Sequence, residues 1–117
     1  MTTEPIFHVA LRPDWEAAQR EGRYRVSTRG RTLEEVGFIH ASYRHQVLPT
    51  GRAFYADVAD EVVVLQIDSD RLGCEVRLED GGGELFPHIY GPIPVAAVCG
   101  QLTATRAHGT FEVPGLE

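Results

Sequence analysis

The sequence predicts a single α+β domain in which short strands outnumber helices. Only two stretches of the 117 residues, both in the N-terminal half, are expected to form helices longer than a single turn. About six short runs are apolar or alternate between apolar and polar residues, which is typical of strands. These runs do not alternate regularly with helices, so a doubly wound parallel sheet is not expected. The length fits one domain, spanning residues 1–117.

In the N-terminal half, a first strand is expected at 6–10 and a helix after it. Pro13 suits the first turn of that helix, and Gly22 is typical of the residue that ends one. Ser42 can cap a second helix at 43–55, which Pro49 should kink or split. Between the helices we expect a short strand at 24–26, a polar loop at 27–31, one helical turn opened by the capping-box pattern at 32–35, and a strand at 38–41.

The C-terminal half is predicted to contain mostly strands. The clearest is 61–67, whose near-continuous apolar run indicates burial on both faces. The remaining expected elements are a strand at 74–78, a glycine loop at 80–83, an extended segment at 86–90, a turn at 91–94, a last strand at 95–105 and a loose tail at 107–117.

Composition and charge narrow the class of function. The net charge is −6, and all 11 basic residues are arginine, so an extended nucleic-acid surface is not expected. Arg23, Arg25, Arg29 and Arg31 cluster in one stretch, which allows a local anion site, although an arginine-rich composition alone also explains it. No signal peptide and no membrane span is expected, which favours a cytoplasmic protein. Two buried free thiols are expected from the two cysteines.

Three histidines lie inside strand-like apolar segments: His8, His40 and His88. A single histidine there is usually a core residue with satisfied hydrogen bonds. Three buried histidines each need a polar partner inside the protein, which favours one shared polar pocket over three separate structural roles. Their spacing does not match a local zinc-ligand pattern, so no metal site is expected.

Carboxylates flank the third histidine segment. Glu79 and Glu84 bracket the glycine loop, and either could act as a base or stabilise a developing cation. The sequence does not choose between them. Ser42 could face the same side as His40 in a strand, but no nucleophile pattern surrounds it, and a helix cap is its simpler role.

The histidine segments together resemble the DUF952 family, short bacterial proteins of unsettled function. The resemblance rests on IFHV at 6–9, WEAA at 15–18, GFIHAS at 37–42 and ELFPHIYGP at 84–92, and it covers roughly residues 6–98. It implies a fold similar to the ADP-ribosyltransferases, a split and mostly antiparallel sheet with a NAD cleft, here with two helices in the N-terminal half. RNA 2′-phosphotransferases show a more distant similarity.

By this resemblance the site residues divide into two groups. His8, Ser42 and Tyr90 would bind the cofactor NAD, with His8 on the ribose hydroxyls. His40, Glu84 and His88 would be catalytic, with Glu84 opposite the cation that forms when the nicotinamide–ribose bond breaks.

Three functional hypotheses follow. The first is a NAD-dependent ADP-ribosyl transferase acting on a small-molecule acceptor. The second is a NAD-independent isomerase, cyclase or hydrolase of a small metabolite that uses His40 and His88. The third is a non-catalytic module that binds a nucleotide or sugar in the same pocket.

Overall fold

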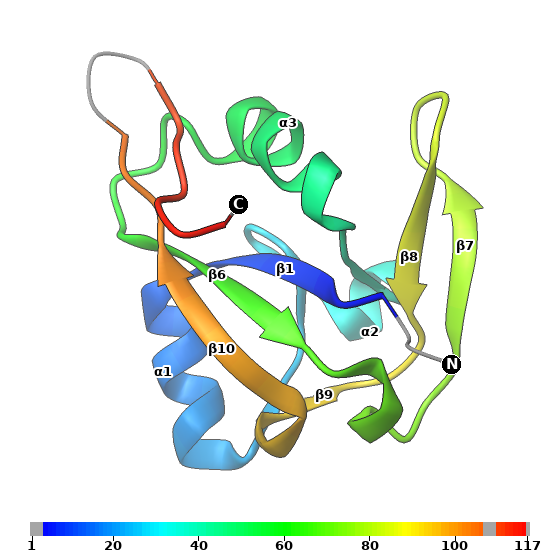
Figure 1. Ribbon diagram of the computed structural model, residues 1–117. Coiled ribbons are helices and arrows are strands. Elements are labelled where there is room, and N and C mark those ends of the chain that lie inside the picture. Colours follow the sequence, from blue (N-terminus) through cyan, green and yellow to red (C-terminus); the bar gives the residue numbers. More distant parts are fainter. Residues whose placement is uncertain (1–3, 107–109, 117) are drawn as a thin grey trace.

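The structure, a computed structural model, describes residues 4–106 and 110–116 and shows an α+β protein with mostly antiparallel strands (Figure 1). Within these residues three helices lie in the N-terminal half: α1 (Arg12–Glu21), α2 (Leu33–Val36) and α3 (Arg44–Phe54). The strands are β1 (Ile6–Leu11), β2 (Arg23–Tyr24), β3 (Val26–Thr28), β4 (Arg31–Thr32), β5 (Ile39–His40), β6 (Val62–Ile67), β7 (Val76–Asp80), β8 (Leu85–Ile89), β9 (Ile93–Pro94) and β10 (Val98–Thr103).

Two three-stranded antiparallel sheets organise the molecule. One has the order β1-β6-β10 and the other β5-β8-β7. They meet where Phe7 and Ser42 exchange both backbone hydrogen bonds, at 2.7 and 2.8 Å. Two smaller pairs, β2-β9 and β3-β4, complete the strands, with short helical turns at Ser69–Arg71 and Val95–Ala97.

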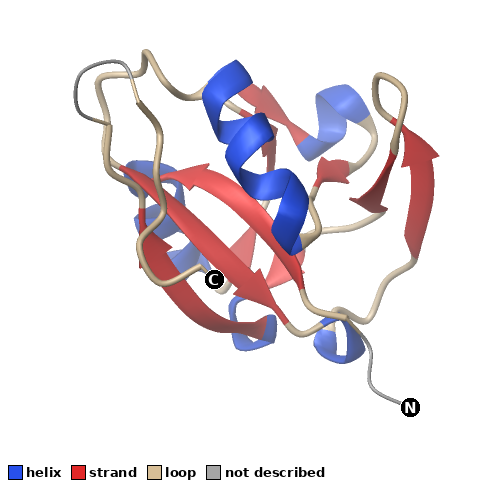
Figure 2. Cartoon of the chain, turned by 45° about the horizontal axis from the view of Figure 1, so that its top comes forward, coloured by secondary structure: helices blue, strands red, loops and turns tan. Residues whose placement is uncertain are grey.

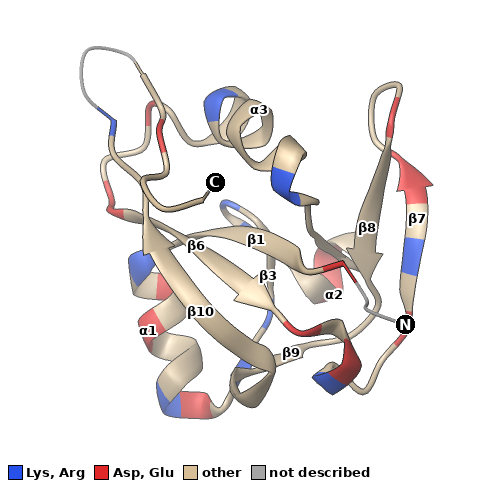
Figure 3. Cartoon of the chain, in the orientation of Figure 1, with Lys and Arg blue, Asp and Glu red and all other residues tan. Residues whose placement is uncertain are grey.

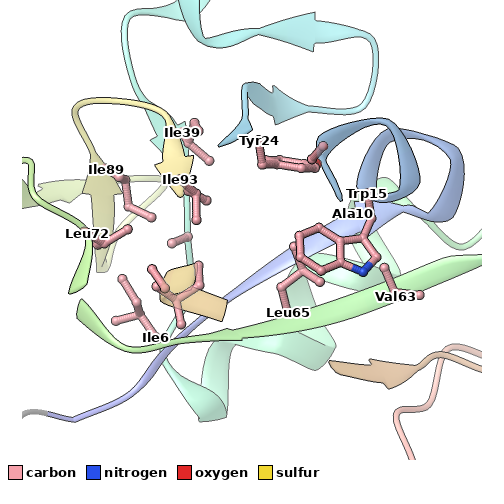
Figure 4. Close-up of a cluster of buried hydrophobic side chains, with 14 residues drawn as sticks. Ile6, Ala10, Trp15, Tyr24, Ile39, Val63, Leu65, Leu72, Ile89 and Ile93 are labelled. Atoms are coloured by element: carbon pink, nitrogen blue, oxygen red, sulfur yellow. The ribbon is translucent and has the colours of Figure 1, made fainter. Parts of the chain in front are cut away.

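Alternation along the strands separates two hydrophobic cores. On β1, Ile6 and Ala10 face α1 and the back of the second sheet, and they belong to the same core as Ile39 and Ile89 (Figure 4). Phe7 and Val9 point the other way, toward α3 and the C-terminal residues. Figure 2 shows α3 lying across this second face. Successive side chains of β6 alternate between the cores, which confirms the predicted burial on both faces.

Local signals explain the first helix and the helical turn. Gly22 ends α1 with a left-handed φ of 90°, as expected from the sequence. Thr32 and Glu35 form the predicted capping box of α2. That turn raises the number of helices from the expected two to three.

Several expected elements differ in the structure. Residues 27–31 are not a loop, because β3 and β4 pair as a hairpin that turns at Gly30. Pro49 does not split α3, in which the flanking residues Val47 and Thr50 are buried. Ser42 is not the N-cap of α3; that residue is Tyr43, and the Ser42 hydroxyl lies 3.5 Å from that of Thr50.

The C-terminal half also departs from expectation at particular residues. Strand β7 begins and ends two residues later than expected, the segment at 91–94 contributes β9, and β10 begins only at Val98. Residues 110–116 are not a loose tail, because Phe111, Val113 and Leu116 belong to the second core. The rest of the expected tail, 107–109 and 117, lies outside the described residues.

Both cysteines are free, as expected, but they are not buried: Cys74 is partly exposed and Cys99 is exposed. No helix in the described residues is long and apolar enough to cross a membrane.

Candidate functional site

The main pocket has a volume of about 680 Å³ and lies between the β3–β4 hairpin, α3 and the β5-β8-β7 sheet. Its size is in the range of small-molecule sites. His40 and His88 both line it. Their neighbours Ile39 and Ile89 point into the first core, so the alternation of β5 and β8 turns the histidines to the opposite, pocket-facing side of the sheet.

Strand pairing brings the two histidines together. His40 and His88 are direct cross-strand partners, although 48 residues separate them in sequence. Nδ1 of His40 lies 3.3 Å from Nε2 of His88. The aromatic rings of Phe38 and Phe86 enclose this pair: Phe38 stacks on His88 at 4.0 Å, and Phe86 lies 4.8 Å from His40.

Glu79 of β7 extends this pair into a chain of three groups. Its Oε1 accepts a hydrogen bond of 2.9 Å from Nδ1 of His88 and one of 2.5 Å from the hydroxyl of Tyr90. The Tyr90 bond, followed by the His88 bond, lowers the pKa of the Glu79 carboxyl, which is therefore ionised at neutral pH. We call Glu79, His88 and His40 the relay.

Hydrogen-bond roles within the relay follow from the carboxylate. An ionised carboxylate only accepts, so Nδ1 of His88 carries a proton. An imidazole ring with its proton on Nδ1 accepts at Nε2, so Nδ1 of His40 donates to Nε2 of His88. Burial, and then the repulsion that a positive charge on His88 would exert, lowers the pKa of His40 to about 4. His40 is neutral at pH 7, and no described residue forms a hydrogen bond with its Nε2. Nε2 therefore has a free lone pair on a residue that lines the pocket.

His8 has a different environment. It is 2% exposed, its Nδ1 donates to the backbone carbonyl of His40 at 2.6 Å, and its Nε2 accepts from the hydroxyl of Tyr24 at 3.1 Å. Both ring nitrogens are thus occupied. His8 and Ser42 line a separate void of about 10 Å³, and neither lines the main pocket.

Comparisons with known proteins identify the family but no activity. The family model described as "Protein of unknown function (DUF952)" matches residues 9–101. The chain belongs to the DUF952 family. The crystal structure of protein CC0527 from Caulobacter crescentus is similar to this DUF952 protein, with a TM-score of 0.79, 29% identity and coverage of 92% of this chain and 93% of that one.

The solution NMR structure of CC0527 is also similar, with a TM-score of 0.74 and 29% identity over 97% of this chain and 94% of that one. No curated protein matches the DUF952 chain. The comparisons therefore support the recognition of the family from its histidine segments, while the function rests on the site itself.

Of the six expected site residues, the pocket brings together His40 and His88. Tyr90 touches the relay through Glu79 and does not line the pocket. Glu84 lies outside: its Oε1 accepts a 2.8 Å hydrogen bond from Gln46 of α3, and His45 lies 3.8 Å away. The sequence did not choose between Glu79 and Glu84 as the functional carboxylate. In the structure, Glu79 is the one that contacts a histidine of the pocket.

Sequence reasoning missed most of the pocket wall. The hairpin contributes Ser27, Thr28, Arg29 and Arg31, and α3 contributes Thr50 and Phe54. Only the two arginines had a sequence signal, the arginine-rich stretch at 23–31. Within the described residues no three His, Cys, Asp or Glu side chains are placed to hold one metal ion.

The stability of this DUF952 protein is expected to fall as the pH drops from about 6.5 toward 4. Burial lowers the pKa of His8 to about 4, so in this window the unfolded chain binds a proton that the folded chain does not. The loss from His8 approaches about 3 kcal/mol by pH 4. Urea unfolding at pH 7, 5.5 and 4.5 measures it. A His8→Gln variant should lose less stability across this range than the wild type, and equal losses would contradict the assignment.

Proposed function

We propose that this protein is an enzyme that moves a proton on a small molecule, with His40 as the base at the end of the relay. The observation that supports the proposal is the unbroken chain from the Glu79 carboxylate through His88 to a neutral His40 that lines the pocket. General acid–base catalysis needs a base held at a fixed position, and strand pairing supplies that rigidity.

Each proton in the proposed step has a defined place. The substrate gives a proton to Nε2 of His40, and His40 passes its Nδ1 proton to Nε2 of His88. The positive charge then rests on His88, next to the Glu79 carboxylate at 2.9 Å. Reversal of the same transfers returns a proton to the product. This serves an isomerase, cyclase or hydrolase equally, and no cofactor is required.

A NAD-dependent ADP-ribosyl transferase with an ADP-ribosyltransferase-like fold is the second proposal. The pocket volume and the two arginines that line it favour this reading, because a dinucleotide needs space and partners for its phosphates. Two features favour the first proposal over it. Both ring nitrogens of His8 are occupied within the protein, and Glu84 faces α3.

A ligand and substrate screen separates these proposals. NAD and ADP-ribose are tested for protection against thermal unfolding, and a panel of small metabolites is tested for turnover. We expect turnover without added NAD, and loss of that turnover in His40→Asn. Turnover that persists in His40→Asn contradicts the relay. A rise in melting temperature with NAD, together with NAD cleavage, favours the second proposal. Binding of metabolites without any turnover favours a non-catalytic module.

A further inference from the structure

We infer that the ligand of the main pocket is a small anion with a flat, apolar body. Its phosphate or carboxylate group pairs with Arg31 and with the free N–H groups of Arg29, and its body packs against Phe54 and Phe86. The inference rests on the proposed function only in placing the ligand in the same pocket as the relay.

The structure divides the arginine-rich stretch into two pairs. Arg23 and Arg25 line a separate, smaller pocket of about 110 Å³ beside α1, and Arg25 lies 3.8 Å from Glu34. Arg29 and Arg31 belong to the β3–β4 hairpin and line the main pocket. In Figure 3 the tip of this hairpin is basic and lies beneath α3. Of the four arginines in this stretch, only Arg29 and Arg31 can therefore contact a ligand in the main pocket.

The guanidinium groups of Arg29 and Arg31 have N–H donors that no described residue accepts from. Arg29 is anchored through one nitrogen, Nη1, which donates to the carbonyl of Phe54 at 2.9 Å and to Oδ1 of Asp57 at 2.7 Å. Its hydrogen bond lowers the pKa of the Asp57 carboxyl, which stays ionised and offsets the charge of Arg29. Arg31 is exposed and has no ion pair with any described residue. A guanidinium group carries five N–H donors in a planar fork that matches carboxylate and phosphate oxygens.

Ser27 provides an independent sign of a missing polar partner on the same hairpin. It is 1% exposed and lines both the main pocket and the small void behind it. Its Oγ is one of two buried side-chain atoms in the described residues without a hydrogen-bond partner. Buried hydroxyl groups are normally paired, so a polar group of a ligand or a water held by it is expected next to Ser27.

Phe54 offers an apolar surface to the body of the ligand. Its side chain lines the pocket although the residue is 50% exposed, and Phe86 lies on the opposite strand wall against His40. An aromatic side chain left open at a pocket is suited to a flat partner. Two carboxylates line the pocket: Asp57, whose charge is paired with Arg29, and Asp80 on the β7–β8 hairpin, which forms no ion pair with a described residue and repels an anion. The anionic group is therefore placed at the β3–β4 end, and the body extends toward the relay.

Four probes test the two parts of the ligand by isothermal titration calorimetry at fixed ionic strength: phenyl phosphate, benzoate, inorganic phosphate and benzyl alcohol. We expect phenyl phosphate or benzoate to bind at least about tenfold more tightly than both inorganic phosphate and benzyl alcohol. Which of the two binds better distinguishes a phosphate from a carboxylate ligand. Arg31→Gln should weaken the better probe about tenfold, and Phe54→Ala should weaken it about threefold.

Arg23→Gln is the matched control, since it removes a charge from the same stretch outside the pocket, and it should bind like the wild type. Equal binding of benzyl alcohol and the charged probes overturns the inference, as does an equal loss in Arg31→Gln and Arg23→Gln. The result does not depend on turnover. Probes that bind as expected support the inference even if no reaction is found, and a substrate that turns over while no anion binds overturns it.

Discussion

Glu79→Gln is expected to lower kcat/KM for a substrate of this pocket by about 10²- to 10⁴-fold. Glutamine keeps an oxygen that can accept from Tyr90, but it carries no negative charge. The imidazolium that forms on His88 during proton transfer would then lose its carboxylate partner at 2.9 Å. The amide can also present its N–H₂ group to Nδ1 of His88, which favours the wrong tautomer of that ring. Both changes weaken His40 as a base.

Glu84→Gln is the matched control for this prediction. It makes the same chemical change five positions away, on a carboxylate that contacts Gln46 and does not line the pocket. Its kcat/KM should stay within about threefold of the wild type, a difference below 1 kcal/mol. A larger loss in Glu84→Gln than in Glu79→Gln would reverse the assignment of the carboxylate.

A second measurement separates an effect on the relay from a general disturbance. The ¹⁵N chemical shifts of the histidine rings report which nitrogen is protonated, and they require no substrate. In the wild type, His88 should be protonated at Nδ1 at neutral pH. In Glu79→Gln this tautomer should lose population, while in Glu84→Gln it should persist. Unchanged His88 shifts in Glu79→Gln would contradict the hydrogen-bond roles assigned to the relay.

The choice between Glu79 and Glu84 shows where sequence reasoning reaches its limit. The sequence predicts a strand at 74–78 and a glycine loop at 80–83, and these bounds leave Glu79 outside the strand, at the edge of the loop. In the structure β7 continues to Asp80, and Glu79 pairs with Phe86 while Arg77 pairs with His88. Paired residues share a face of the sheet, so this register turns Glu79 toward His88 and Tyr90. A shift of two residues in one strand boundary thus decided which carboxylate reaches the site.

Features that depend on local signals could be predicted. Strand β1, the end of α1 at Gly22, the capping box of α2 and the buried strand β6 each follow from neighbouring residues. The pairing of His40 with His88 depends on contacts 48 residues apart. Segment patterns indicated that both histidines lie in strands and favoured a shared polar pocket, but they did not predict that the two residues pair across the sheet. The β3–β4 hairpin was missed because its residues are polar, and it gains its order from contacts with α3 such as that of Arg29 with Phe54.

Phe111→Ala is expected to lower the free energy of unfolding by about 3–5 kcal/mol. The sequence suggests a loose tail here, and on that view the substitution would cost almost nothing. The structure instead buries Phe111 completely in the second core, against Val47 of α3 and Val62 of β6. Urea unfolding followed by circular dichroism measures the change. Glu112→Ala, an exposed neighbour in the same segment, should change stability by less than about 0.5 kcal/mol. Similar small losses in both variants would support the loose tail.

Gly51 of α3 makes this prediction sharper, because its missing side chain leaves room for the Phe111 ring. A Cβ atom at position 51 would overlap that ring, so Gly51→Ala alone should destabilise the protein by about 1–3 kcal/mol. This loss would occur although alanine favours a helix over glycine by about 1 kcal/mol. In the Phe111→Ala background the ring is gone, and the added methyl group enters the cavity. Gly51→Ala should then be neutral or stabilising. If the effect of Gly51→Ala on the free energy of unfolding changes sign in this double-mutant cycle, the C-terminal segment packs directly on α3, the helix that forms one wall of the pocket. Additive losses in the two variants would place Phe111 elsewhere.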